Sequence, residues 1–149
     1  MNETSPVIFG ADHAGLPLKQ TLISTLQDRG IACEDQGTDS DQSTDYPKFA
    51  AKTCQRLLET GSLGVLICGT GLGMSMTANR FRHVRAALCS NEYMARMARA
   101  HNNANLLCLG SRVLGQDLAL SILEAFLSTE FEGGRHQRRV DMIDTIQAG

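Results

Sequence analysis

The sequence of 149 residues contains no tryptophan, and aromatic residues make up only 5% of it. This scarcity argues against a stacking platform for single-stranded nucleic acid. The formal net charge of −2 gives no general attraction to DNA, RNA or acidic membranes. No apolar stretch approaches the ~20 residues of a membrane-spanning helix, and the apolar run near the amino end is too short for a signal peptide. We therefore expect a cytoplasmic protein in which any recognition of anions is local.

The sequence also lacks a C-x-x-C pair, and its five cysteines are an odd number: Cys33, Cys54, Cys68, Cys89 and Cys108. This usage fits a reducing compartment better than a disulfide scaffold or a zinc ribbon. The length fits a single domain, 1–149, and the sequence shows no repeat, linker or low-complexity segment.

Strand-like apolar segments alternate with helix-like segments along the chain. We expect strands over 7–10, 31–35, 63–68, 86–89 and 105–110, and a polar loop over 36–45. We expect helices over 16–29, from 45 onward, over 73–80, over 91–100, around 118–126 and from about 135. This alternation predicts an α/β protein with a three-layer, Rossmann-like fold, in which helices flank a five-stranded parallel sheet. Ligands in such folds bind beyond the carboxyl ends of the strands.

The most informative stretch is the apolar run 64–67, which ends in Cys68 and continues into Gly69, Gly71 and Gly73. Glycines let backbone N–H groups approach an anion, and a helix that starts there adds positive potential beside the thiol. The stretch lacks the Lys and Ser/Thr of a nucleotide-binding loop. Met74 stands where a phosphatase-type thiol site would carry an arginine, which disfavours phosphatase chemistry. From the residues alone, Cys68 is either an inert buried thiol or a reactive group.

Other polar residues follow the ends of predicted strands: Asp12, His13, Ser90, Asn91, Ser111 and Arg112. Asp12 is a candidate for proton transfer, but it is also a suitable cap for the next helix. His101 has the same double interpretation, because a histidine near a helix C-terminus interacts favourably with the helix dipole. Arg135 and Arg139 would project from one helix face, either as a phosphate clamp or as a solvated surface. We assign no role to Arg80, Arg82 and Arg85, which look like a solvated loop.

Several of these motifs, in this order, resemble the sugar-phosphate isomerase family that contains ribose-5-phosphate isomerase B and the galactose-6-phosphate isomerase subunits of the lactose pathway. The resemblance runs from Val7 to about Ile146. Its landmarks are Asp12-His13, Thr44-Asp-Tyr-Pro47, Ile67-Cys-Gly-Thr-Gly-Leu-Gly73, Ala100-His-Asn102, Gly110-Ser-Arg112 and Glu132-Gly-Gly-Arg-His136. A sister branch of the family has Ser at position 68 and Glu at position 74, so this sequence resembles the branch with a cysteine base.

The resemblance implies an enzyme that interconverts ribose 5-phosphate and ribulose 5-phosphate, a step of the pentose phosphate pathway, without a metal or an organic cofactor. It implies that Cys68 is the base that moves a proton between C2 and C1. It implies that His101 opens the furanose ring, with Asp12 as its partner. Thr70 and the amides of Gly69, Thr70, Gly71, Leu72 and Gly73 would stabilise the enediolate.

The remaining implied roles concern substrate binding and assembly. The phosphate would be held by His13, Arg112, Arg135 and Arg139, and the sugar would be lined by Tyr46 and Asn102. The family is usually dimeric or tetrameric, so we expect a homo-oligomer with a shared active site. We expect a neighbouring subunit to supply the side with His101, Asn102 and Arg112, and the C-terminal helix to pack on a partner.

Three alternatives stay open at this point. The first is an isomerase of a six-carbon sugar phosphate, such as allose 6-phosphate or galactose 6-phosphate, because one hydroxymethylene separates the two substrate classes. The second is a non-catalytic sugar-phosphate sensor on the same fold. The third is a thiol-dependent hydrolase, which would require Cys68 and a histidine in contact.

Overall fold

Five strands form one parallel sheet in the computed structural model, which describes residues 5–147. The strands are β1 (Val7–Ala11), β2 (Cys33–Asp35), β3 (Gly64–Cys68), β4 (Ala86–Leu88) and β5 (Leu106–Gly110). Their hydrogen bonds give the order β2-β1-β3-β5-β4, and every neighbouring pair is parallel. The predicted fold class and the five predicted strands are confirmed, with small shifts at the strand ends.

Six helices connect and extend the strands: α1 (Leu16–Asp28), α2 (Tyr46–Thr60), α3 (Leu72–Ala78), α4 (Glu92–Ala100), α5 (Gln116–Ser128) and α6 (Arg135–Thr145). Local signals explain several of their ends. Pro17 occupies the first turn of α1. The side chain of Asn91 accepts a hydrogen bond of 2.8 Å from the backbone N–H of Met94 and caps α4. Gly61 ends α2 in the left-handed conformation, with φ of +68°.

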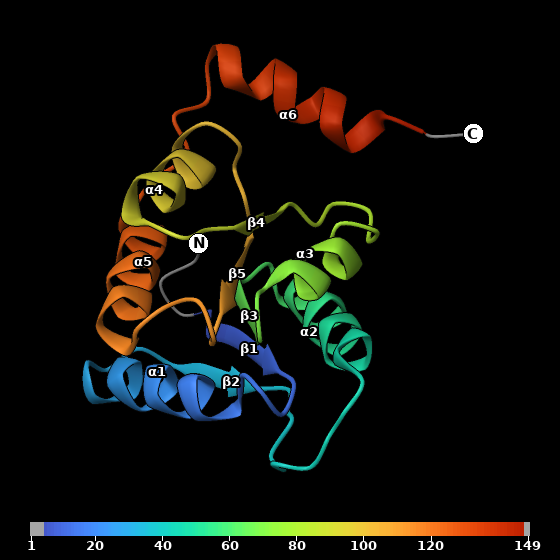
Figure 1. The fold of residues 1–149 in the computed structure, drawn as a ribbon. Coiled ribbons are helices and arrows are strands. Elements are labelled where there is room, and N and C mark those ends of the chain that lie inside the picture. The colour runs from blue at the N-terminus through green and yellow to red at the C-terminus, as the bar shows by residue number, and fades with distance from the viewer. Residues whose placement is uncertain (1–4, 148–149) are drawn as a thin grey trace.

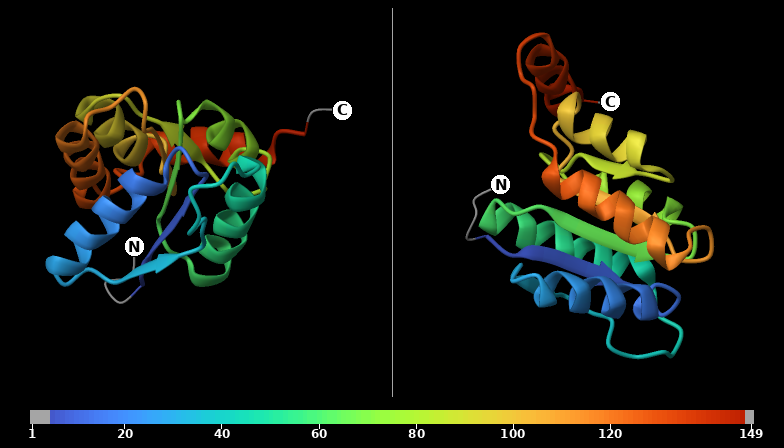
Figure 2. Two further views of the ribbon diagram at one scale, coloured as in Figure 1. Left: turned by 60° about the horizontal axis from the view of Figure 1, so that its bottom comes forward. Right: turned by 90° about the vertical axis from the view of Figure 1, so that its left-hand side faces the viewer.

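Helices cover both faces of the sheet (Figures 1 and 2). One core lies between the sheet and α1, α4 and α5, where Phe9, Ile67 and Leu107 meet Leu22 and Phe126. The other lies between the sheet and α2 and α3 and includes the side chain of Cys68. All residues of the three central strands, β1, β3 and β5, are buried. Their apolar runs are continuous because both faces of a parallel sheet are covered.

Helix α6 extends away from the sheet at the end of the described chain (Figure 1). Val140 is buried, but three other apolar side chains of this segment are at least half exposed: Met142, Ile143 and Ile146. The predicted helix is therefore confirmed, while its packing on a partner stays a prediction. Within residues 5–147, no helix is long and apolar enough to cross a membrane.

The parallel register gives the sheet two distinct edges. We call the edge where the strands end the carboxyl edge, and the edge where they begin the amino edge. Cys68 pairs with Gly110 at the carboxyl edge, and Gly64 pairs with Leu106 at the amino edge. Four residue steps of strand, roughly 13 Å, separate the two edges.

Candidate active site

Cys68 is the last residue of β3, and its thiol lies at the start of the glycine-rich loop. The side chain is buried, and Sγ accepts a hydrogen bond of 3.1 Å from the backbone N–H of Gly71. This contact fixes the position of the sulfur beside the loop amides. The predicted meeting of a thiol and a glycine loop at a strand end is thus found in the structure.

Burial keeps the other four cysteines in the thiol form. Burial raises the pKa of Cys33 and Cys89 to about 11 and that of Cys54 to about 12. Burial also raises the pKa of Cys108, with smaller contributions from neighbouring thiols. These four side chains are therefore protonated at neutral pH.

Close packing of the glycine loop explains its sequence. Gly71 has a φ of +83°, and a Cβ there would lie 2.5 Å from Cδ1 of Leu88. A Cβ on Gly73 would lie 2.5 Å from the ring of Tyr46, so the tyrosine sits directly against the loop. Thr70 is exposed, and its hydroxyl oxygen accepts a hydrogen bond of 3.2 Å from the N–H of Leu72.

Asp12 and His13 follow β1 and reach the same carboxyl edge. Oδ1 of Asp12, which is buried, accepts a hydrogen bond of 3.0 Å from the N–H of Gly15, just before α1. Nδ1 of His13 accepts a bond of 3.1 Å from the N–H of Thr44, whose hydroxyl accepts one of 3.3 Å from the N–H of His13. Because Nδ1 is an acceptor, the neutral ring carries its proton on Nε2, which is left as a donor.

Ser111 and Arg112 follow β5 and join this cluster. Ser111 Oγ donates to the carbonyl of Ala14 at 2.8 Å and lies 3.2 Å from that of Cys68. Arg112 donates its backbone N–H to the carbonyl of Gly69 at 2.9 Å. Its Nη1 would lie 3.2 Å from a Cβ placed on Gly69.

The position of Arg112 corrects one expectation. We expected it on the side supplied by a neighbouring subunit, together with His101 and Asn102. It lies instead over the glycine loop of its own chain, because β5 pairs with β3 and both strands end at the same edge.

His101 and Asn102 lie at the amino edge, because α4 runs back from the end of β4 to the start of β5. Asn102 is exposed and borders a cavity of about 280 Å³ between α4 and β4. Arg135 and Arg139 are exposed on α6. Glu132, three residues before this helix begins, donates its N–H to the carbonyl of Ala100. One chain therefore brings the predicted residues together in two groups at opposite edges, and Cys68 does not meet His101 within it.

A compact cluster surrounds His101. Its ring stacks on that of His136, with centroids 4.2 Å apart and planes 12° from parallel, and its Nε2 lies 3.7 Å from a carboxylate oxygen of Glu132. Desolvation, followed by the influence of His101 and Arg135, lowers the pKa of His136. Sequence reasoning used Glu132 and His136 only as landmarks, since the stack joins residues far apart in the chain.

The same three side chains offer ligand atoms within 4.8 Å of one another, a donor set that suits a divalent transition metal. The lone pairs of an imidazole nitrogen lie in the plane of its ring, however. The two stacked ring planes are nearly parallel, so the lone pairs of the two rings point along separate planes. In this arrangement they do not converge on one ion.

Arg85 was missed by the sequence analysis, which treated it as a solvated residue. Its side chain is only 15% exposed, and it forms an ion pair with Asp144 at 3.1 Å. The partner lies 59 positions further along the chain, so no local pattern pointed to it.

Comparison with known proteins identifies the family of this chain. Residues 7–143 match the family model described as Ribose/Galactose Isomerase. The chain belongs to the ribose/galactose isomerase family. Ribose-5-phosphate isomerase B of Escherichia coli is 44% identical over 143 residues, which cover 95% of either chain.

Solved structures of other family members have the same fold. A ribose 5-phosphate isomerase of Thermotoga maritima matches with a TM-score of 0.93 and 49% identity, over 96% of this chain and 99% of that one. Ribose-5-phosphate isomerase B of Mycoplasma genitalium, solved with bound ribulose-5-phosphate, matches with a TM-score of 0.92 and 39% identity, over 96% of each chain.

Proposed function

We propose that this chain interconverts ribose 5-phosphate and ribulose 5-phosphate at a site built by two copies of the chain. One observation carries the proposal: in a member of this isomerase family, the sulfur of Cys68 lies beside the amide-lined glycine loop at the carboxyl edge. The second copy is required because His101 lies at the opposite edge of its own sheet.

Proton transfer is the role proposed for Cys68. In the open-chain aldose, the thiolate takes the proton from C2, and the electrons of that bond form the C1–C2 double bond of an enediolate. The C1 carbonyl oxygen becomes the oxyanion. The thiol then returns the proton to C1, while the proton of the C2 hydroxyl moves to the C1 oxygen and leaves a ketone at C2. The Gly71 N–H, 3.1 Å from Sγ, positions the sulfur for this transfer.

Stabilisation of the enediolate is the role proposed for the glycine loop. The proton next to a carbonyl is only weakly acidic, so a base acts together with donors to the developing oxyanion. Thr70 and the amides of residues 69–73 supply these donors, and Gly71 and Gly73 let the backbone come close. Tyr46 packs against Gly73 and closes the sugar side of the loop.

Ring opening and phosphate binding are proposed to join the two edges. His101 of one copy faces the anomeric centre that is bound by the other copy, with Asp12 as its partner. Arg112 and the Nε2–H of His13 approach the phosphate from the carboxyl edge. Arg135 and Arg139 of α6, together with Asn102, come from the amino edge of the second copy. Phosphate binding far from C1 and C2 supplies energy that aligns the reacting carbons.

An apolar helix face and the free cysteines support the proposed assembly and location. The exposed Met142, Ile143 and Ile146 give the α6 segment an apolar face that a second copy would cover. The five free thiols support a cytoplasmic location, since thiols persist in a reducing compartment.

The proposed reaction is tested by replacing Cys68 with alanine. We expect Cys68→Ala to lose isomerisation and exchange of the C2 proton with solvent by about a thousandfold or more, while ribulose 5-phosphate still binds. The readouts are turnover, proton exchange in deuterated water by NMR, and calorimetric binding. Cys33→Ala, on β2, is the matched control and should keep wild-type turnover.

Two results would contradict the proposal. One is a Cys68→Ala variant that retains turnover, which removes the base. The other is a wild-type enzyme that turns over allose 6-phosphate or galactose 6-phosphate but not ribose 5-phosphate, which replaces the five-carbon substrate by a six-carbon one.

A further inference from the structure

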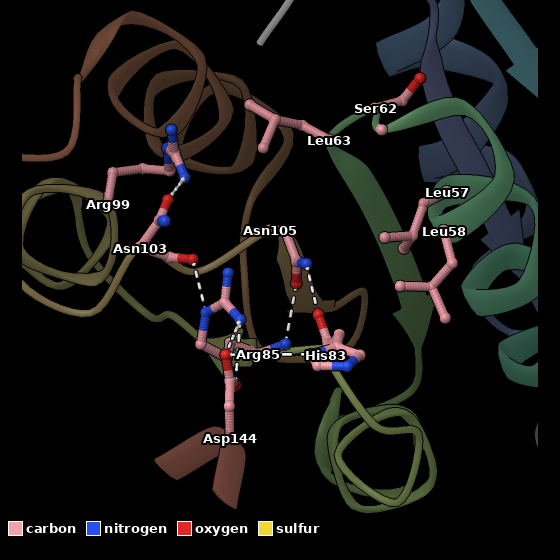
Figure 3. A pocket seen from close by; sticks show the side chains of 11 residues that line it. Leu57, Leu58, Ser62, Leu63, His83, Arg85, Arg99, Asn103, Asn105 and Asp144 are labelled. Carbon is pink, nitrogen blue, oxygen red and sulfur yellow. Dashed lines mark hydrogen bonds and ion pairs between the residues drawn. The ribbon is translucent and has the colours of Figure 1, made fainter. Parts of the chain in front are cut away.

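Arg85 joins two parts of the amino edge that carry proposed site residues. It lies just before β4, and its Nη1 donates to both carboxylate oxygens of Asp144 on α6, each at 3.1 Å. Its Nε donates to the backbone carbonyl of Asn103 at 2.9 Å. One guanidinium thus bonds both to the turn that follows His101 and to the last turn of α6 (Figure 3).

The turn after α4 is held in a defined conformation by this network. Asn103 has a φ of +46°, and its side-chain oxygen accepts a bond of 3.1 Å from Arg99. The side chain of Asn105 accepts from the N–H of Arg85 at 2.8 Å and donates to the carbonyl of His83 at 2.8 Å. These groups line a cavity of about 450 Å³ at the amino edge (Figure 3). The turn therefore keeps support from Arg99 and Asn105 when the side chain of Arg85 is changed.

Helix α6 has fewer attachments. Within residues 5–147, its side-chain hydrogen bonds to the rest of the chain all run through Asp144, which also lies 4.0 Å from His83. At its first turn, the ring of His136 stacks on that of His101. Arg139 lies between these two attachments and Arg135 directly precedes the first, so the direction of both arginines depends on how the helix is held.

We infer that Arg85 is a positioning residue that fixes His101 relative to Arg135 and Arg139. It does so by bridging the carbonyl of Asn103 and the carboxylate of Asp144. The inference rests on the proposed function, in which His101 opens the sugar ring and the two arginines bind the phosphate. Without the bridge, α6 pivots about the His136–His101 stack, and the phosphate site shifts against the ring-opening group.

The chemistry of the bridge requires arginine. The side chains of Arg85 and Asp144 are 15% and 21% exposed, so solvent screens this pair less than a surface pair. A guanidinium donates from several nitrogens at fixed angles, whereas all the donors of an ammonium are on one nitrogen. A lysine at position 85 keeps the charge but does not span both partners.

The test compares Arg85→Lys, Asp144→Asn and the double variant with the full-length wild-type protein. We expect each single variant to raise the KM for ribose 5-phosphate about fivefold, with a smaller fall in kcat, and the double variant to match the singles. We also expect the His101 ring resonance to move in the NMR spectrum of both single variants. Arg82→Lys, at an exposed neighbouring arginine, is the control and should change neither KM nor the resonance.

Each outcome decides the inference. Folded variants with wild-type KM, Arg85→Lys included, or single-variant effects that add in the double variant would overturn it. Asp144→Asn decides alone if Arg85→Lys fails to fold, because it leaves the Arg85–Asn103 bond in place. A wild-type enzyme without activity on ribose 5-phosphate contradicts the proposed function instead, and the His101 resonance then still reports whether Arg85 positions that ring.

Discussion

At the scale of single residues, the surroundings of the titratable groups differ from one side chain to the next. Burial raises the pKa of Cys54 to about 12, but the sulfur of Cys68 receives a backbone N–H. Desolvation acts in the opposite direction on His136, whose charged form is the protonated one. It lowers the pKa of this histidine from the ordinary value of 6.5. The sequence located Cys68 by its glycines, whereas nothing local to His136 indicated its stack on His101.

The lowered pKa of His136 predicts a dependence of stability on pH. The unfolded chain takes up the proton near pH 6.5, while the folded chain takes it up only at lower pH. The unfolded state therefore binds more protons in this window, and the free energy of unfolding falls as the pH drops below about 6.5. The part of the free energy of unfolding that depends on neutral His136 is fully lost below the pKa of the folded state.

Urea unfolding between pH 7.5 and pH 5 measures this effect. His136→Gln removes the titrating group and should make the fall in the free energy of unfolding shallower than in the wild type. An equally steep fall in the variant would show that His136 is not the group responsible.

At the scale of elements, the strands and helices were predictable because each carries its own signal. The buried runs of β1, β3 and β5 are continuous, and Pro17 and Asn91 mark helix starts. Strand order was not predictable, because no residue pattern encodes which strands pair. The bonds from Thr44 to His13 and from Arg85 to Asp144 were missed for a similar reason, since each joins segments that only the fold brings together.

The loop between β3 and α3 allows a sharp prediction about backbone fit. Gly71→Ala places a methyl group 2.5 Å from Leu88 at a φ of +83°. We expect a loss of about 1–3 kcal/mol in the free energy of unfolding and a strong fall in kcat, because the Gly71 N–H contacts Cys68.

Gly115→Ala is the matched control for this substitution. Its Cβ meets no atom within 4 Å, and its φ is −71°. Its unfolding free energy should stay within about 0.5 kcal/mol of wild type. Denaturant unfolding and steady-state kinetics of both variants decide the matter, and equal behaviour of the two would refute the steric account of the loop.

At the scale of the whole molecule, the parallel sheet separates the proposed site into two halves. Asp12, His13 and Arg112 follow strand ends, and Cys68 is the last residue of β3. His101 precedes β5 by about one turn of chain. The sequence indicated both groups of residues through the resemblance, but only the fold shows that they lie at opposite edges. A complete proposed site therefore needs the carboxyl edge of one copy and the amino edge of another.

Mixing two inactive variants tests this claim most directly. Cys68→Ala and His101→Asn are each expected to be inactive as pure proteins. A mixed dimer contains one site with both groups intact and one with neither, so equal mixing with full subunit exchange should restore about a quarter of the wild-type activity on ribose 5-phosphate. A mixture that exchanges subunits, as shown by mass spectrometry of the intact dimers, and yet stays inactive would contradict the shared site.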